Sequence, residues 1–220
     1  MPLSFRQKHL QLTVFFNTVL FPFDAMQFLR ALSRSGYVLS VELPPLSPAR
    51  RLSIPGPVGT KGSISARIDT TRGFVGVEGP DERDLIEEFR GIENILQKDL
   101  ELDVPALTHF CEFLANGVVG GTGKNPVNII ARAVDASALL EQISKIVGRP
   151  TSIFGLRLSA EGLMPNAPDW FDITINPYVL APDRYYYVNV VYRQSERRPV
   201  VRFARGFEDF LSRTLAAMES

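Results

Sequence analysis

Several short stretches of the chain alternate hydrophobic and polar residues, which is the pattern of a β-strand with one buried face. In residues 63–69 the alternation places Ile64, Ala66 and Ile68 on one side, and the turn-forming sequence TTRG separates this stretch from residues 74–79. The two stretches therefore predict a β-hairpin. Further strands, rich in β-branched and aromatic residues, are predicted at 9–19, 37–43, 107–119, 151–160, 170–180 and 185–194.

Other stretches space their hydrophobic residues by three or four positions, which indicates amphipathic α-helices. The clearest one covers residues 80–100, where Asp81 and other acids stand in the first turn, the place that the helix dipole favours. Its hydrophobic stripe consists of Leu85, Phe89, Ile92 and Leu96. Glu87, Glu88 and Glu93 lie off this stripe, so we expect all three to be solvated.

Three more helices are predicted: one within residues 21–36, with Asp24 as its N-cap, one at 126–148 and one at 198–219. The helix at 126–148 can break at Asp135. Its inward residues are expected to be Ile130, Val134, Leu140, Ile143 and Val147. In the last helix, the spacing of Arg205, Asp209 and Arg213 predicts successive ion pairs.

Both halves of the chain show the same order of predicted elements. Residues 1–103 and residues 104–220 each give a strand, a helix, three or four strands and a long helix. We therefore predict an α+β fold in which two similar β-α-β(3–4)-α halves form one curved antiparallel sheet with helices on one face. Pairing the two sheets edge to edge would bury an edge strand of each half, and both halves can belong to one continuous domain. The proline-rich residues 44–62 are expected to be a connection or flap.

The sequence RIDTTRGFVGVEGPDERDLIEEF, residues 67–89, is similar in style to the hairpin that leads into the long helix of the TATA-binding protein family. The order of elements over most of the chain also resembles the saddle architecture of that family. The resemblance implies an internal duplication and a concave sheet that binds nucleic acid, with paired phenylalanines wedged between base steps. Such pairs cannot be placed in this sequence, and a net charge of zero departs from the basic surface of the family. The resemblance therefore concerns the fold, which does not determine function.

Composition and charge limit the classes of partner. The chain has 220 residues, of which 45% are hydrophobic and 22% charged, as in a globular protein. Its net charge of zero excludes a general basic field for nucleic acid or membrane, although residues 184–205 contain six arginines and one glutamate. The single cysteine, Cys111, excludes an internal disulfide and indicates a reducing, cytoplasmic compartment. No apolar run reaches the roughly 18 residues that span a bilayer.

The glycine-rich sequence NGVVGGTGKNP, residues 116–126, partly matches the phosphate-binding pattern G-x-x-x-x-G-K-[ST]. Gly123 and Lys124 fit its second half, but a valine takes the place of the first glycine and an asparagine replaces the hydroxyl residue. We interpret the stretch as a turn before a helix. A looser anion site remains open, in which Gly121, Gly123 and Lys124 meet a phosphate at the helix N-terminus.

The sequence RYYYVNVVYRQSERR, residues 184–198, combines aromatic residues with arginines. Alternation places Tyr185 and Tyr187 on one face, close in sequence to Arg193, Arg197 and Arg198. Packing within the chain or a dimer is the default interpretation. A protein interface is the next, since such interfaces are enriched in tyrosine and arginine. Stacking on nucleic-acid bases is the third.

Catalytic motifs are weak. His109 and Cys111 are two positions apart in a strand, but a thiolate nucleophile needs a contacting base and a third orienting group. We interpret them as a buried thiol beside a core histidine. Two histidines and one cysteine predict no metal site.

We therefore expect a non-catalytic binding protein without a cofactor. Its open sheet face or its tyrosine- and arginine-rich strand would bind a macromolecular partner: another protein, a second copy of the chain, or nucleic acid. The alternative is an enzyme or a pocket protein that binds a small molecule or phosphate ligand at the junction of the halves, near the turn at 117–124.

Overall fold

The computed structural model describes residues 4–40, 53–120, 123–133 and 136–220. Within these residues there are nine strands, seven α-helices and a short π-helical segment, η1. The strands are β1 (Ser4–Phe16), β2 (Val38–Leu39), β3 (Ser53–Lys61), β4 (Ile64–Asp69), β5 (Phe74–Gly79), β6 (Thr108–Gly120), β7 (Leu156–Ser159), β8 (Trp170–Pro177) and β9 (Tyr186–Gln194). The helices are α1 (Ala25–Arg34), α2 (Glu82–Asn94), η1 (Ile95–Asp99), α3 (Val104–Leu107), α4 (Pro126–Ala133), α5 (Ser137–Val147), α6 (Arg197–Arg205) and α7 (Phe207–Glu219).

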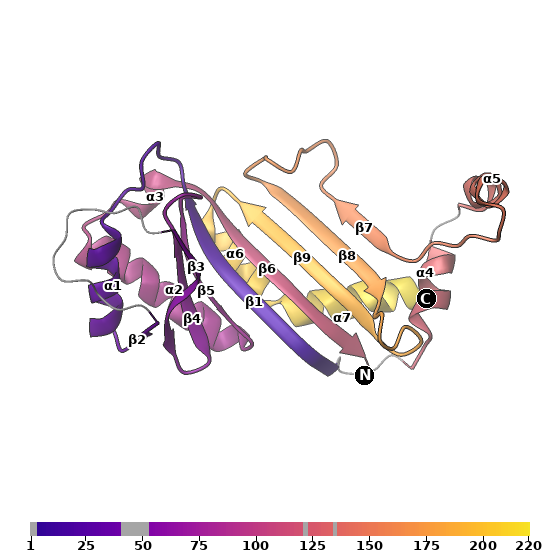
Figure 1. Cartoon of the computed structure of the whole chain (residues 1–220), viewed down its shortest axis with the longest axis horizontal. Coiled ribbons are helices and arrows are strands. Elements are labelled where there is room, and N and C mark those ends of the chain that lie inside the picture. Colours follow the sequence, from indigo (N-terminus) through magenta and orange to yellow (C-terminus); the bar gives the residue numbers. More distant parts are fainter. Residues whose placement is uncertain (1–3, 41–52, 121–122, 134–135) are drawn as a thin grey trace.

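All nine strands form one sheet in the order β2-β3-β4-β5-β1-β6-β9-β8-β7, and each neighbouring pair is antiparallel. The predicted α+β class with an antiparallel sheet is therefore confirmed. The two longest strands, β1 and β6, lie side by side at its centre (Figure 1). Their register places Leu12 opposite Phe113.

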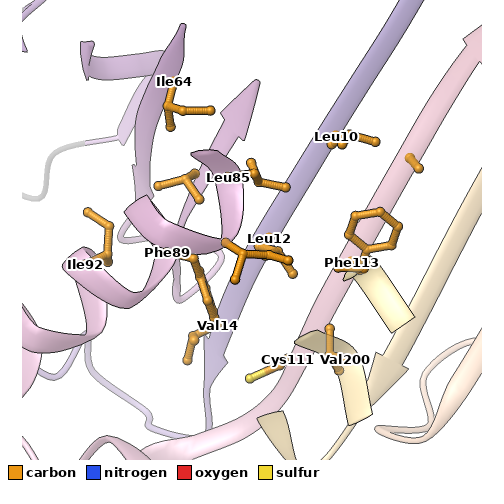
Figure 2. Close-up of a cluster of buried hydrophobic side chains, with 14 of the residues drawn as sticks. Leu10, Leu12, Val14, Ile64, Leu85, Phe89, Ile92, Cys111, Phe113 and Val200 are labelled. Carbon is orange, nitrogen blue, oxygen red and sulfur yellow. The ribbon is translucent and has the colours of Figure 1, made fainter. Parts of the chain in front are cut away.

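Helices α1, α2, α6 and α7 pack on one face of the sheet and bury residues in its core; α6 and α7 are seen behind the sheet in Figure 1, and α1 and α2 at its left. Alternation along β1 turns Leu10, Leu12 and Val14 toward these helices, and all three are buried. Figure 2 shows them in one cluster with side chains of α2, β6 and α6. The predicted stripe of residues 85–96 is confirmed, because its four members are all buried in this core: Leu85, Phe89, Ile92 and Leu96.

The predicted helix starts are also confirmed. The carboxylate of Asp24 accepts a hydrogen bond from the backbone N–H of Met26 (2.8 Å), and that of Asp81 accepts one from Asp84 (2.9 Å). Each side chain thus satisfies an amide that has no partner within its helix. After α1, Gly36 adopts a left-handed conformation (φ 88°), which ends the helix at little steric expense.

The proline-rich stretch differs from the prediction. Residues 53–61 form β3, which pairs with β4, whereas residues 44–52 lie outside the described part of the chain. Pro57 is tolerated because the register shifts on both sides of it and because β2 pairs only with Gly59 and Thr60. No described strand therefore requires an N–H from Pro57 on its other side.

Two predicted helices also differ. In residues 126–148 the break separates α4 from α5, and Val134 and Asp135 lie outside the described residues. Ile130 is buried as predicted, but α5 buries none of its residues, and Val147 is half exposed. The last helix is interrupted at Gly206; Asp209 pairs with Arg213 (2.6 Å), and the predicted pair with Arg205 is missing from the ion pairs of the described residues.

The sidedness of the sheet can be tested with two leucines. Leu12→Ala removes a fully buried side chain under α2 and should lower the free energy of unfolding by about 2–5 kcal/mol. Leu114→Ala, on the opposite face of neighbouring β6, removes a half-buried side chain and should lower it much less. Urea denaturation measures both values. Equal losses would contradict the assignment of faces.

Candidate functional site

The sheet face opposite the helices is turned toward the viewer in Figure 1. At its centre, strand register lines up an imidazole, two amides and a hydroxyl in a row across four strands. The row consists of His9, Asn116, Asn189 and Thr174. A second row, one step along the strands, includes Gln11, Leu114 and Val191. These side chains are half-buried by their neighbours, and they form a band of polar and apolar groups between the carboxylates of Glu78 on β5 and Asp172 on β8.

Charged side chains on this face are paired with one another. Arg67 donates to Glu78 (2.8 Å), and the neighbouring His9 lies 3.7 Å from the same carboxylate. Arg157 binds Asp172 across the β7–β8 pair through two nitrogen atoms, at 2.9 and 2.5 Å. In each of these pairs a basic group is matched by a carboxylate on a neighbouring strand, so the pairs add little net charge to the face.

An aromatic row crosses the sheet near the end of β1. Phe15 stacks on Phe110 (ring centroids 4.5 Å apart) and contacts Phe74 (5.2 Å). The guanidinium of Arg193 lies 4.9 Å from the ring centre of Phe110 and 5.2 Å from that of Trp170. Phe74, Phe110 and Trp170 are buried, so these rings are not exposed for stacking on bases.

Arg193, one of the predicted partner-binding residues, is held by the protein itself. Its Nε donates to Glu112 (2.5 Å) and its Nη1 donates to the backbone carbonyl of Pro165 (2.7 Å). Together with the two cation–π contacts, these bonds fix the loop between β7 and β8 against the sheet.

The two predicted tyrosines lie toward the other end of β9. Tyr187 is exposed on the helix-free face. Tyr185 lies against Gly120, where a Cβ would come within 2.6 Å of the ring, so only glycine fits there. The guanidinium of Arg6 covers the Tyr185 ring at 4.3 Å. Of the two, Tyr187 is the more accessible to a partner.

Arg197 and Arg198 lie elsewhere, at the start of α6 in the helical layer, so the structure does not unite the predicted set. Arg197 forms an ion pair with Glu93 of α2. Glu93 is buried, which corrects the expectation of a solvated carboxylate. Burial raises the pKa of Glu93 more than the nearby Arg197 and Arg90 lower it.

A cavity of about 450 Å³ lies beside this ion pair, lined by Gln97, Thr108, Cys111 and Ser195 among others. Burial, with a smaller effect of Glu93, raises the pKa of the Cys111 thiol to about 12. His109 is exposed, not in the core as expected. Among the described residues, no group of three or more histidine, cysteine, aspartate or glutamate side chains could hold a metal ion.

The predicted anion-binding turn lies at the opposite end of β6 from this cavity. Gly121 is outside the described residues, and Gly123 has a left-handed conformation (φ 74°). Lys124 donates a hydrogen bond to the backbone carbonyl of Glu219 in α7. The carboxamide oxygen of Asn125 accepts from the amides of Val127 (3.0 Å) and Asn128 (3.3 Å), donors that an anion would otherwise use.

No protein-family model, curated protein or solved structure matches the chain. In the described part of the chain, no helix combines the length and the apolar character needed to cross a membrane.

The environment of Cys111 predicts an inert thiol. The thiol has a pKa of about 12 and is almost unexposed. The folded protein should therefore react with a thiol reagent such as DTNB at pH 8 far more slowly than the unfolded chain. The rate of thionitrobenzoate release, followed by absorbance with and without denaturant, measures the difference. Rapid stoichiometric labelling of the native protein would contradict this description.

Proposed function

We propose that this chain is a non-catalytic binding protein whose helix-free sheet face holds a macromolecular partner. The observation that carries the proposal is the arrangement of the sheet: α1, α2, α6 and α7 pack on one face, and the other face presents Asn116, Asn189, Thr174 and the exposed Tyr187. Because charges on this face are paired, a protein is a better partner for it than a polyanion.

The distribution of exposed hydrophobic residues supports a protein partner. Of the 13 exposed large hydrophobic residues in the described part of the chain, seven fall between β6 and β8: Leu139, Ile146, Val147, Phe154, Leu158, Leu163 and Met164. This segment includes α5 and β7, which is an end strand of the sheet. Apolar surface and an unpaired strand edge are both features of protein interfaces. A second copy of the chain is the first partner to test.

The proposal includes an internal duplication with the saddle architecture of the TATA-binding protein family, formed by the halves 1–103 and 104–220. The strand order supports it. On one side of the centre the sheet runs β1-β5-β4-β3-β2, and on the other it runs β6-β9-β8-β7, so strands of corresponding position in the two halves take corresponding places. A cytoplasmic location also belongs to the proposal, supported by the unpaired thiol of Cys111.

The alternative of a ligand pocket near residues 117–124 has less support. Lys124 and the first free amides of α4 already have partners within the chain.

Self-association provides the direct test. Sedimentation velocity from low to high micromolar concentration should show a dimer, and Asn116→Arg with Asn189→Arg should abolish it, because like charges would meet at the centre of the interface. The matched control is Asn94→Arg with Asn128→Arg, which adds the same charge at exposed helical positions and should leave the dimer intact. A wild-type monomer at every concentration would exclude a second copy as the partner, and equal effects of both variants would exclude the sheet face.

A further inference from the structure

A groove in the helical layer, between α2 and α6, concentrates arginines. The two helices pack against each other. Arg83 and Arg90 are two turns apart on α2, and Arg198, Arg202 and Arg205 follow one another on α6 at steps of four and three. At these spacings the side chains of each helix project to one side, so two arginine rows border the same groove.

The groove consists of two adjoining hollows of about 450 and 370 Å³, which share Arg90 and Arg205 in their linings. Six arginines line them in total, the five named above and Arg197. The acids in the lining are Glu82 and Glu87. Six positive charges less two negative charges give the lining a formal charge of +4.

Arg90 and Arg205 lie near enough to Glu93 and Glu82 to lower the pKa of those carboxyls, but most of the groove arginines lack the short ion pairs of the sheet face. Arg197 forms an ion pair with Glu93, whereas the other five groove arginines form no ion pair with a described residue. Burial, together with the nearby Glu208, raises the pKa of Glu82 to about 7, so this carboxylate carries less than a full negative charge near neutral pH. Arg198 and Arg202 are four positions apart on one helix, where like charges destabilise the helix. A bound anion would relieve this repulsion.

We propose that the groove between α2 and α6 binds the phosphodiester backbone of a single-stranded nucleic acid. A guanidinium group can donate two parallel hydrogen bonds to the oxygens of one phosphate, a bidentate geometry. The two hollows measure about 450 and 370 Å³, which is room for one phosphodiester strand and not for a duplex. Because the lining contains no aromatic ring, recognition is by charge and is independent of base sequence.

A nucleic acid fits the lining better than an acidic peptide does. Peptides are anchored in grooves mainly by apolar side chains that enter pockets. The apolar members of this lining are Ile86, which is buried, and Val201, which is half-buried. The groove therefore offers a row of charges without an apolar anchor. It is also separate from the sheet face, so it does not depend on the function proposed above.

Salt dependence provides the quantitative test. Each phosphate contact to a single strand contributes about −0.7 to the slope of log K against log salt concentration, so five free arginines predict a slope of about −3.5. Fluorescence anisotropy with a labelled oligo(dT) should then show about 130-fold weaker binding at 200 mM than at 50 mM salt.

The decisive variant is Arg198→Gln, Arg202→Gln and Arg205→Gln together. It leaves two free arginines, so we expect a slope of about −1.4 and only about 7-fold weakening over the same salt range. The matched control is Arg30→Gln, Arg132→Gln and Arg149→Gln, which removes the same charge from exposed positions outside the groove and should keep the wild-type slope. Circular dichroism melting checks that both variants fold.

Three outcomes would overturn the proposal: no binding of oligo(dT) at low salt, equal loss of slope in the two triple variants, or tighter binding of poly-glutamate than of oligo(dT). The variant with Asn116→Arg and Asn189→Arg should bind oligo(dT) through an intact groove with at least the wild-type affinity. A failure of the sheet-face proposal and a failure of the groove proposal are thus distinguished in the same set of proteins.

Discussion

The antiparallel pairing of β1 with β6 is the constraint on which the rest of the structure depends. Both strands are 13 residues long, and they join strands β5 to β2 on one side to strands β9 to β7 on the other. Because successive side chains point to opposite faces, the register of Leu12 with Phe113 decides which residues of both halves reach the helices. A slip of one residue would turn the apolar side chains of β1 toward water. One pairing thus fixes the core and, at the same time, the composition of the uncovered face.

Charged side chains are arranged differently on the two sides of the sheet. On the uncovered face, ionic groups stand on adjacent strands and satisfy one another, as Arg157 and Asp172 do. In the helical layer, the arginines of α2 and α6 converge, and Glu93, the acid paired with one of them, is buried beneath the surface. The net charge of zero therefore conceals a local excess of positive charge at the α2–α6 groove. Overall charge bounds the long-range field, but local placement of charges decides where an anion can bind.

Local sequence patterns predicted the elements whose determinants are local. The alternation of Ile64, Ala66 and Ile68 and the caps Asp24 and Asp81 are properties of a few adjacent residues, and the structure has β4, α1 and α2 where these signals place them. The burial of Glu93 escaped prediction because its partner, Arg197, is 104 positions away in the sequence. Likewise, α5 has an apolar stripe without a described element to cover it. Periodicity shows that a helix has an apolar side, whereas the topology determines whether anything packs there.

In the candidate sites, too, the sequence indicated the local features, whereas the topology decided which residues lie together. The tyrosine- and arginine-rich stretch suggested one surface, but the strand ends before Arg197, so its last two arginines belong to α6 and to the other side of the sheet. The resemblance to a saddle architecture implies nucleic acid on the sheet face, yet that face matches its own charges and buries three of the four rings in its aromatic row. Electrostatics favour the opposite layer for a polyanion and leave the sheet face for a neutral partner. The two surfaces lie on opposite sides of one sheet, so the two partners that we propose, a protein and a nucleic acid, would not compete for contacts.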